Sequence, residues 1–374
     1  MRIVDIRQAT VPISRYADPD LPSGGLTTST VALVTDQIRG GRPVVGYGFA
    51  SFGRFGQQAL IAERFAPRLL AAGDVEPETA WAAMMAGEKP GGHGERCVAV
   101  GTLDMAMWDA AAKCAGLPLA AFLARRLGRE PALDVPVYAG GGYRYPTDDL
   151  GHLADEARRA RDLGFDRMKI KIGGGATLDD DRRRIDTVAK VLGGTNRVAV
   201  DAMNSYDAPA CIAAAKALAP PGLWWFEDIC DPLDFATQGA AARVYPGAIA
   251  AGEALFSLAE ARLLDRHGGL RRDRDILLFD PVHCYGLTHY IEMVAALERL
   301  GWPRAAFWPH GGHLFTLHIV AALGLGGAEV NPFSFPPFGG LHDDARIQAG
   351  RAAPPDLPGI GLGGRADLFR LLDA

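Results

Sequence analysis

Cysteine is scarce in this chain, and its distribution excludes a disulfide framework. The 374 residues include 5 cysteines, an odd number spread from Cys97 to Cys284 without a CxxC pair. Neither a fold held by disulfides nor a cysteine-ligated zinc site is therefore expected. A reduced cytosol is the default compartment for such a chain, so we expect a cytoplasmic protein.

Long apolar runs are also missing. No stretch of 18 or more apolar residues occurs, so the sequence predicts no transmembrane helix and no membrane partner. The first residues, MRIVDIRQATVPI, mix charged and β-branched side chains. They predict a β-strand and lack the apolar core of a signal peptide.

The chain has no excess of positive charge. Its 39 Lys and Arg residues stand against 44 Asp and Glu residues, which leaves a formal net charge of −5. Proteins that bind nucleic acid usually carry a basic face, so nucleic acid is not the expected partner. An anionic small molecule remains possible, because the charge inside a pocket can differ from the net charge.

Two patterns of sequence meet near residue 130. The first pattern predicts an α+β capping domain over residues 1–130, with antiparallel strands followed by helices. A Gly-Gly pair between the second and third strands suits a hairpin. The predicted strands cover about 1–13, 28–36 and 43–50, and the predicted helices cover about 56–72, 77–86 and 93–115.

Residues 131–332 alternate short apolar strands with amphipathic helices. The strand-like segments are DVPVYAG, RMKIKIG, RVAVDAM, LWWFED, AIAAGEA, ILLFDPV, AAFWPHG and GGAEVNP. Eight such strands with interleaved helices are typical of a β/α barrel, although a doubly wound open sheet gives a similar alternation. The barrel is favoured because nearly every strand ends in a polar residue, at the end where such barrels carry their active sites. The tail, residues 333–374, is rich in Pro and Gly and is predicted to pack on the capping domain.

The polar residues at the strand ends follow one another at regular intervals. From Lys171 the steps through Asp201, Glu227, Glu253, Asp280, His310 and Glu329 are 30, 26, 26, 27, 30 and 19 residues. Because each step is about one strand and one helix, we expect these side chains at one mouth of the barrel.

Three of these strand-end residues predict a metal site. Converging carboxylates at Asp201, Glu227 and Glu253 are costly unless a cation neutralises them. Oxygen ligands with room for water and substrate suit Mg²⁺. One carboxylate at a strand end is as often merely solvated, but three in the same register favour the metal. Asp228 is an alternative to Glu227, which the 26-residue steps on both sides favour.

Lys169 and Lys171 lie two residues apart on one strand, so both face the same side. The rest of that strand is apolar, and two inward lysines need a reason. Adjacent ammonium groups near a metal should lower each other's pKa and create a base that works near neutral pH. Two lysines that extend to the barrel rim are the structural alternative.

Asp280 and His310 end the sixth and seventh predicted strands. An aspartate beside a histidine selects its tautomer and favours its protonated form. From across the barrel, His310 would act on the opposite face of a substrate. A hydrogen-bonded core histidine is the alternative. His313, in the string HGGH, is predicted to begin a helix and to be structural.

Together these residues resemble the enolase superfamily, in its mandelate racemase branch, over essentially the whole chain. The resemblance implies an α/β fold with a (β/α)₇β TIM-like barrel and an α+β cap built from both ends of the chain. It implies Mg²⁺ ligands at Asp201, Glu227 and Glu253, a base at Lys171 assisted by Lys169, an Asp280–His310 dyad, and a substrate-carboxylate contact at Glu329. Members of the family usually form homo-oligomers. The strings that carry the resemblance are MKIKIGG, VDAMN, WFED, AGEAL, LFDP, PHGGH and GAEV.

Within this branch, further strings resemble the D-tartrate dehydratases. They are VVGYGFASFGRFGQ, EKPGGHGERCVAVGTLDMAMWD, DPLD and DLPGIG. The resemblance implies substrate contacts from Lys89, toward a distal carboxylate, and from Asn204. Ala50 and Ala254 stand where that group has Asn, so a shift in specificity is expected. The Pro- and Gly-rich segment 15–25 is predicted to close over the substrate.

The predicted reaction begins with removal of the proton next to a carboxylate, in an acid sugar or a small, tartrate-like hydroxy diacid. If His310 then protonates a leaving β-hydroxyl group, the product is a 2-keto acid, and this dehydration is the preferred interpretation. If His310 returns a proton to the carbon, the enzyme is a racemase or epimerase. A Schiff-base aldolase would leave the three carboxylates unexplained. A non-catalytic sugar-acid-binding protein is favoured only by the loss of the amide side chains at Ala50 and Ala254.

Overall fold

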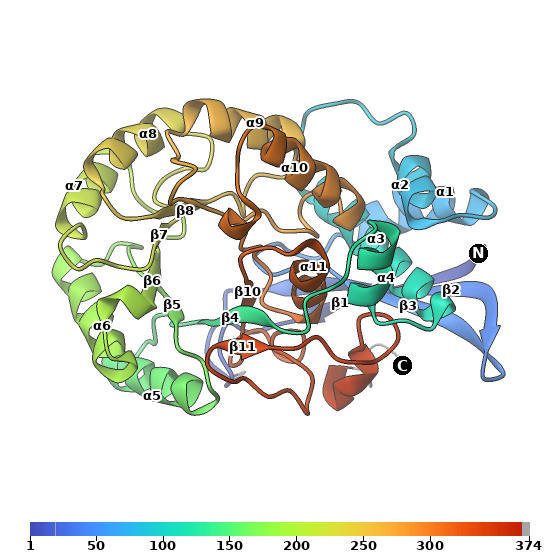
Figure 1. Cartoon of the computed structure of the whole chain (residues 1–374), viewed down its shortest axis with the longest axis horizontal. Coiled ribbons are helices and arrows are strands. Elements are labelled where there is room, and N and C mark those ends of the chain that lie inside the picture. The colour runs from blue at the N-terminus through green and yellow to red at the C-terminus, as the bar shows by residue number, and fades with distance from the viewer. Residues whose placement is uncertain (19, 369–374) are drawn as a thin grey trace.

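Figure 1 shows the computed structural model of the chain, which describes residues 1–18 and 20–368. A ring of strands surrounded by helices occupies one side, and a smaller unit with the amino-terminal strands lies against it. No helix in the described residues has both the length and the apolar character to cross a membrane.

The smaller unit begins with an antiparallel sheet of three strands, in the order β1–β2–β3. Gly40 and Gly41 connect β2 to β3, and both have positive φ, 55° and 77°. Two-residue hairpins of this kind require positive φ, which glycine adopts without strain, so the predicted hairpin is confirmed. The strands are β1 (Ile3–Pro12), β2 (Thr27–Arg39) and β3 (Arg42–Phe49).

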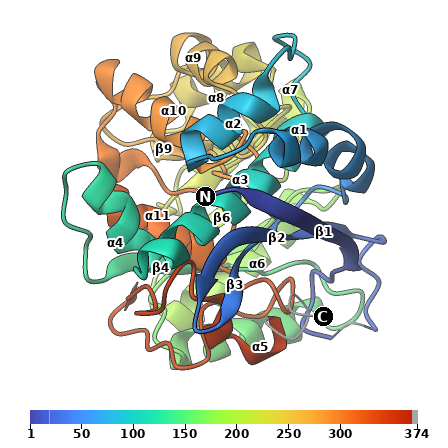
Figure 2. The same ribbon diagram turned by 90° about the vertical axis from the view of Figure 1, so that its right-hand side faces the viewer.

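Helices cover this sheet, and the longest of them packs directly on β3 (Figure 2). Gly46 and Gly48 of β3 allow the close approach, because a Cβ atom at either would clash with the carbonyl oxygens of Ala106 and Thr102. The helical segments are a π-helix (Leu60–Phe65), α1 (Ala66–Ala71), α2 (Pro77–Met85), α3 (Glu95–Ala115) and α4 (Leu119–Arg126).

Buried Asp109 on α3 joins the sheet, the helix and the carboxy-terminal tail. Its Oδ2 accepts hydrogen bonds from the Tyr47 backbone at 2.8 Å and from Lys113 Nζ at 2.6 Å. Its Oδ1 accepts from the Ile360 backbone at 2.7 Å. The tail also forms β11 (Arg351–Ala352), which pairs with the first barrel strand, so it contacts both units. The predicted domain boundaries stay predictions.

Replacement of Asp109 by Ala should lower the free energy of unfolding by about 2–4 kcal/mol, because two buried backbone donors lose their acceptor. Urea unfolding followed by circular dichroism measures this loss. Asp179→Ala is the control, since the Asp179 side chain is 81% exposed and should leave the urea midpoint unchanged. Equal midpoints for the Asp109 variant and the parent would contradict this role.

The larger unit is a ring of parallel strands in the order β10–β4–β5–β6–β7–β8–β9, which confirms the predicted fold class. The strands are β4 (Val135–Gly140), β5 (Met168–Lys171), β6 (Val198–Asp201), β7 (Phe226–Glu227), β8 (Ile249–Ala251), β9 (Ile276–Leu277) and β10 (Ala328–Val330). The helices are α5 (Asp149–Asp162), α6 (Leu178–Leu192), α7 (Ala208–Ala217), α8 (Phe235–Val244), α9 (Leu258–His267), α10 (Leu287–Arg299) and α11 (Leu314–Leu323).

The predicted strand AAFWPHG is not a continuous strand. Phe307 forms an isolated parallel bridge with Leu277, and the His310 backbone donates to the Leu278 carbonyl at 3.1 Å. Trp308 and His310 both donate their backbone N–H groups toward β9, to the Leu277 and Leu278 carbonyls. Pro309 between them has no N–H to offer to the opposite neighbour, which interrupts the ladder there. The segment therefore continues the ring beside β9 through separate contacts.

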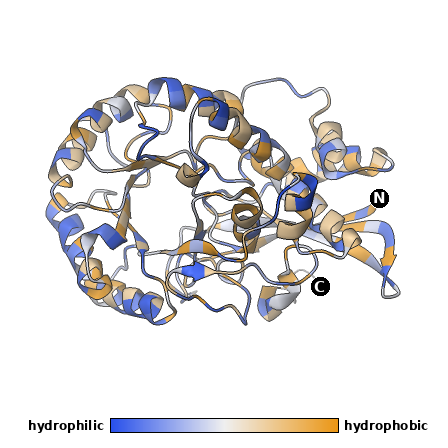
Figure 3. Ribbon diagram, viewed as in Figure 1, coloured by the Kyte–Doolittle hydropathy of each residue, from blue (hydrophilic) through white to orange (hydrophobic). Residues whose placement is uncertain are grey.

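The interior of the ring is aromatic one layer below the predicted site. The rings of Tyr138, Trp225 and Trp308 lie within 5.1–6.0 Å of one another. Trp225 Nε1 donates to Glu227 Oε2 at 2.7 Å, so this layer supports a predicted ligand. Helix α11 is buried along its length and is hydrophobic in Figure 3, whereas the outer helices carry hydrophilic stretches.

Candidate active site

Three predicted carboxylates come together at the ends of adjacent strands. Asp201 ends β6, Glu227 ends β7, and Glu253 follows β8. One ligand atom from each lies within 4.8 Å of the others. The register pairs Asp201 with Glu227, so the parallel ladder itself sets this convergence.

The chemistry of this carboxylate cluster fits Mg²⁺. All its donors are hard oxygen atoms, and the buried Oε2 of Glu253 has no hydrogen-bond partner in the described residues. Burial, with repulsion from Asp201 and Glu253, raises the pKa of Glu227 to about 8 in spite of the nearby Lys169. A divalent cation bound by these oxygens would relieve the repulsion.

Asp228, the alternative ligand, is buried but is not a member of the converging group. Burial, followed by repulsion from Glu253 and Asp201, raises the pKa of Asp228 well above its ordinary value. Glu227 belongs to the converging group and Asp228 does not, so the geometry favours Glu227 as the ligand.

Both lysines of β5 face the cluster. The Nζ atom of Lys169 lies 2.5 Å from Glu227 Oε1 and 3.2 Å from Glu329 Oε1, and this side chain is 1% exposed. Lys171 Nζ donates a hydrogen bond to Asp201 and lies 5.2 Å from the centre of the Tyr143 ring. Neither lysine extends to the rim.

The nearby carboxylates set the pKa values of the two lysines in this structure, and the lowering expected beside a metal stays a prediction. Burial favours the neutral amines, but Glu227 and Glu329 raise the pKa of Lys169 well above its ordinary value. Asp201 likewise outweighs burial and raises the pKa of Lys171. The prediction considered two ammonium groups and a metal, whereas the carboxylates are the nearest charges.

His310 and Asp280 form the predicted pair. His310 Nδ1 lies 2.7 Å from Asp280 Oδ2, and Nε2 lies 3.6 Å from Glu253 Oε2. The other oxygen of Asp280 accepts a hydrogen bond from the Val282 backbone at 2.7 Å, which orients the carboxylate. Burial favours neutral imidazole, but Glu253 and Asp280 raise the pKa of His310 to about 9. The carboxylates on both sides of the ring thus favour the imidazolium form of His310.

Asp280→Asn should lower the pKa of His310 from about 9, while Glu253, the larger cause of the rise, still holds it above its ordinary 6.5. Because these carboxylates raise the folded-state pKa, their interactions with His310 contribute stability fully below pH 6.5, which is lost as the pH rises to about 9. Proton–carbon NMR of the imidazole in the metal-free protein measures the titration. Asp155→Asn, whose side chain is 65% exposed on α5, should leave the titration unchanged. An unaltered pKa in the Asp280 variant would contradict the assignment.

The remaining predicted residues differ in their surroundings. Glu329 on β10 lies in the polar centre, where it contacts Lys169 and accepts from the Gly311 backbone at 3.3 Å. Lys89 is exposed in the loop between α2 and α3. Asn204 donates through Nδ2 to the Cys230 carbonyl at 2.8 Å. No contact in the described chain brings Lys89 or Asn204 to the carboxylate cluster, and their substrate contacts stay predictions.

His283 is a further polar residue at this site, and the sequence analysis did not identify it. It is 3% exposed, its Nδ1 lies 3.8 Å from Asp280 Oδ2, and its ring centre lies 5.7 Å from that of His310. Asp280, His283 and His310 thus form a second group of possible ligand atoms within 4.8 Å. Two of these residues, Asp280 and His310, are already hydrogen-bonded to each other, so they are not free to bind a metal. A histidine three residues after Asp280 was the available signal.

Two loops of the cap reach the barrel mouth. Tyr16, in the segment predicted to close, donates to the Arg144 carbonyl at 2.5 Å. Ser51 Oγ lies 3.3 Å from Nε2 of His313, which begins α11 as predicted. Burial lowers the pKa of His313 to about 4, so it stays neutral. Closure over a substrate stays a prediction.

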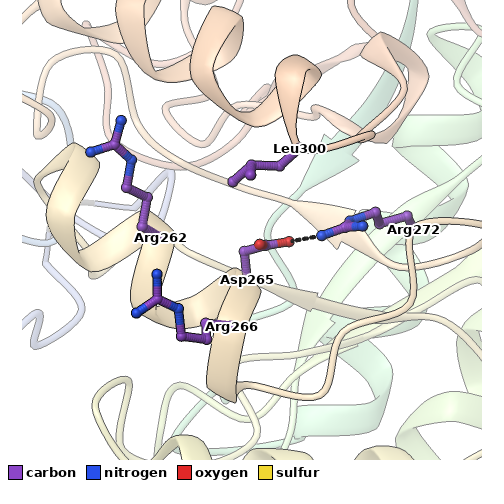
Figure 4. A pocket seen from close by; sticks show the side chains of 5 residues that line it. All are labelled: Arg262, Asp265, Arg266, Arg272 and Leu300. Atoms are coloured by element: carbon purple, nitrogen blue, oxygen red, sulfur yellow. Dashed lines mark hydrogen bonds and ion pairs between the residues drawn. The ribbon is translucent and has the colours of Figure 1, made fainter.

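A separate cavity of about 440 Å³ lies on the outer surface, at α9 and the end of α10. Arg272 pairs with Asp265 there at 2.9 Å, while Arg262 and Arg266 point away from that pair (Figure 4). The cavity contains none of the predicted site residues and has no cluster of converging cations.

Comparison with known proteins agrees with the fold and the cluster. Residues 152–367 match the family described as "Enolase C-terminal domain-like". The chain is 27% identical over 356 residues to arabinonate dehydratase of Saccharolobus solfataricus, covering 92% of this chain and 91% of that protein. It is 30% identical over 278 residues to 3,6-anhydro-α-L-galactonate cycloisomerase of Streptomyces coelicolor, covering 73% and 70%.

A solved structure adds the metal. L-Talarate dehydratase from Polaromonas sp. JS666, complexed with Mg and L-glucarate, matches with a TM-score of 0.75 at 26% identity, covering 96% of this chain and 94% of that one. The family match spans more than half of the chain, and its carboxylate cluster has the donor set that magnesium needs. The chain therefore belongs to the enolase superfamily, in its mandelate racemase and muconate lactonizing branch, with Mg²⁺ as its cofactor.

Proposed function

We propose that this protein is an acid-sugar dehydratase, which removes the α-proton of a hydroxy acid and then its β-hydroxyl group to yield a 2-keto acid. The observation that carries the proposal is the pair of proton-transfer groups on opposite sides of the carboxylate cluster. Lys171 contacts Asp201 at one side, and His310 Nε2 faces Glu253 at the other. A relative that acts on arabinonate and a related structure with L-glucarate support an acid-sugar substrate.

The first step is proton abstraction. Asp201, Glu227 and Glu253 would hold Mg²⁺, which would supply stabilisation of the negative charge that develops on the substrate carboxylate. Lys169, fixed between Glu227 and Glu329, adds a positive charge beside that carboxylate. Lys171 takes the α-proton as a neutral amine. Its ammonium group must therefore first break the ion pair with Asp201 and give a proton to solvent.

The second step is loss of water. His310 Nε2–H gives its proton to the departing β-hydroxyl group, so that water leaves and an enol remains, which becomes the 2-keto acid. Asp280 holds Nδ1 of the ring and keeps His310 protonated before the step. Afterwards Lys171 returns its proton to solvent and His310 takes one up, which restores the starting state.

Racemisation or epimerisation is the second candidate, and the same opposed pair favours it. In that reaction His310 gives its proton to the α-carbon, and no water is lost. A non-catalytic sugar-acid-binding protein would have no need for the Asp280–His310 hydrogen bond or for Lys171 beside the cluster.

A panel of acids in D₂O with Mg²⁺, followed by proton NMR, tests the proposal. The panel contains aldonic and aldaric acids, and also D-tartrate because of the sequence strings that resemble D-tartrate dehydratases. Loss of one acid with appearance of a 2-keto acid is expected. Exchange of the α-proton without a keto product would replace dehydration by racemisation or epimerisation. Absence of exchange with every acid, while Mg²⁺ binds, would contradict the proposal.

A further inference from the structure

Arg54, in the cap loop after β3, carries a positive charge without a partner of opposite sign. The residue is half-buried, and its guanidinium carbon lies 4.6 Å from the centre of the Phe256 ring. Among residues 1–18 and 20–368, its guanidinium forms no ion pair and no hydrogen bond. Arg96, another partly buried arginine, is by contrast paired with Glu88 at 3.1 Å. Because a partly desolvated cation favours an anionic partner, a ligand is the natural candidate.

A short series of ring contacts connects Arg54 with the active site. Phe256 follows the metal ligand Glu253 by three residues. Its ring centre lies 5.6 Å from that of His283, which lies 5.7 Å from that of His310. Arg54 is therefore on the His310 side of the barrel mouth.

The loop that carries Arg54 is fastened to the barrel. Ser51 Oγ lies 3.3 Å from His313 Nε2, and the ring of Phe52 stacks on Phe335 with centres 4.2 Å apart. Thr28 Oγ1 also donates to the Ala50 carbonyl at 2.7 Å. Because these contacts hold the loop, Arg54 is positioned before a ligand binds, which lowers the entropy cost of binding.

The carboxylates on the His310 side already have partners of opposite charge. Asp280 pairs with His310, and Glu253 is a ligand for the metal, so Arg54 is left to bind the second carboxylate of a diacid. Ala50 and Ala254 supply no polar side chain for a neutral substrate end. We propose that Arg54 binds the carboxylate remote from the metal, so that the enzyme prefers aldaric acids to aldonic acids. This inference rests on the proposed function for the position of the first carboxylate.

Two other cap cations are rivals for this role. Arg15 also lies over an aromatic ring, 5.8 Å from the centre of Tyr143, but that ring adjoins Lys171 at 5.2 Å on the opposite side. Lys89 is exposed, and its loop is held through its backbone carbonyl by Arg96 at 3.0 Å. Loss of aldarate binding in Arg15→Gln or Lys89→Gln, with Arg54→Gln unchanged, would transfer the role to that residue. Arg158→Gln and Arg182→Gln, whose side chains are 52% and 47% exposed on α5 and α6, are the matched controls for Arg54→Gln.

Calorimetric binding with Mg²⁺ tests the inference in a Lys171→Met background, where turnover is blocked. Pairs of aldaric and aldonic acids with the same hydroxyl configuration, such as galactarate and galactonate, are the probes. We expect an aldarate to bind about 10-fold or more tightly than its aldonate. Arg54→Gln should weaken aldarate binding by about 10- to 100-fold and change aldonate binding by less than about 2-fold. Arg54→Lys should be intermediate, and both controls should resemble the parent.

Two results would overturn the inference. One is an aldarate affinity that Arg54→Gln leaves unchanged, and the other is a panel in which no aldarate binds more tightly than its aldonate. Unchanged Mg²⁺ affinity and melting temperature in Arg54→Gln would establish that the variant is folded. Binding requires no proton transfer, so failure of the D₂O experiment would contradict the proposed function and leave the role of Arg54 to be decided by calorimetry.

Discussion

Lys171→Met should lower kcat for acid-sugar turnover by about 10⁴-fold or more, because Lys169, the other lysine of β5, is held between Glu227 and Glu329 and cannot replace it as the base. Methionine is unbranched and of similar length, so it can occupy the space between Asp201 and the Tyr143 ring without a charge. Loss of the ammonium group also frees Asp201, so Mg²⁺ affinity should stay the same or increase. Formation of 2-keto acid and magnesium calorimetry measure the two effects separately.

Lys190→Met is the control for the loss of a lysine charge, since Lys190 is exposed on α6. It should retain the parental rate. A Lys171→Met enzyme with more than about one hundredth of the parental kcat would contradict the assignment of Lys171 as base. A large loss of Mg²⁺ affinity in the same variant would indicate that Lys171 supports the metal site instead.

Glu227→Gln should weaken Mg²⁺ binding by at least about 100-fold and abolish turnover, because one of the three anionic ligands is lost. Asp228→Asn should change Mg²⁺ affinity by only a few-fold. Asp228 stands outside the cluster, so its replacement removes no ligand, and Asn has nearly the same shape. Its φ of 46° also suits Asn.

Calorimetry with Mg²⁺ after removal of bound metal by EDTA measures both variants. The variant with the weaker Mg²⁺ affinity identifies the ligand. If Glu227→Gln still binds Mg²⁺ and Asp228→Asn does not, Asp228 is the ligand. Restoration of activity by added Mg²⁺ in the parent protein shows that the chelator did not unfold the chain.

The strand-end residues could be predicted because a parallel barrel repeats. Each strand and its helix take 26–30 residues from Lys171 to His310, so regular spacing alone indicates that these side chains share one mouth. The repeat does not require every strand to be regular. Pro309 interrupts the ladder before His310, yet the His310 backbone still bonds to Leu278, and the side chain reaches Asp280.

Features that depend on contacts between the two units could not be predicted. Arg54 meets Phe256, and Ser51 meets His313, across more than 200 residues of chain. Nothing in the local sequence near Arg54 specifies that pairing. The direction of the Lys169 pKa shift could not be predicted for a related reason. It depends on the distance from Lys169 to Glu227 and not on the spacing of the two lysines.

The most direct test is exchange of the substrate α-proton in D₂O by a His310→Asn variant, followed by proton NMR. It asks whether Lys171 removes the α-proton and His310 protonates the leaving hydroxyl group. The proposed mechanism predicts that exchange continues with Mg²⁺, because Lys171 is intact, while formation of the 2-keto acid falls by about 10²- to 10⁴-fold. Lys171→Met should show no exchange. Exchange that persists in Lys171→Met and disappears in His310→Asn would contradict the mechanism and make His310 the base.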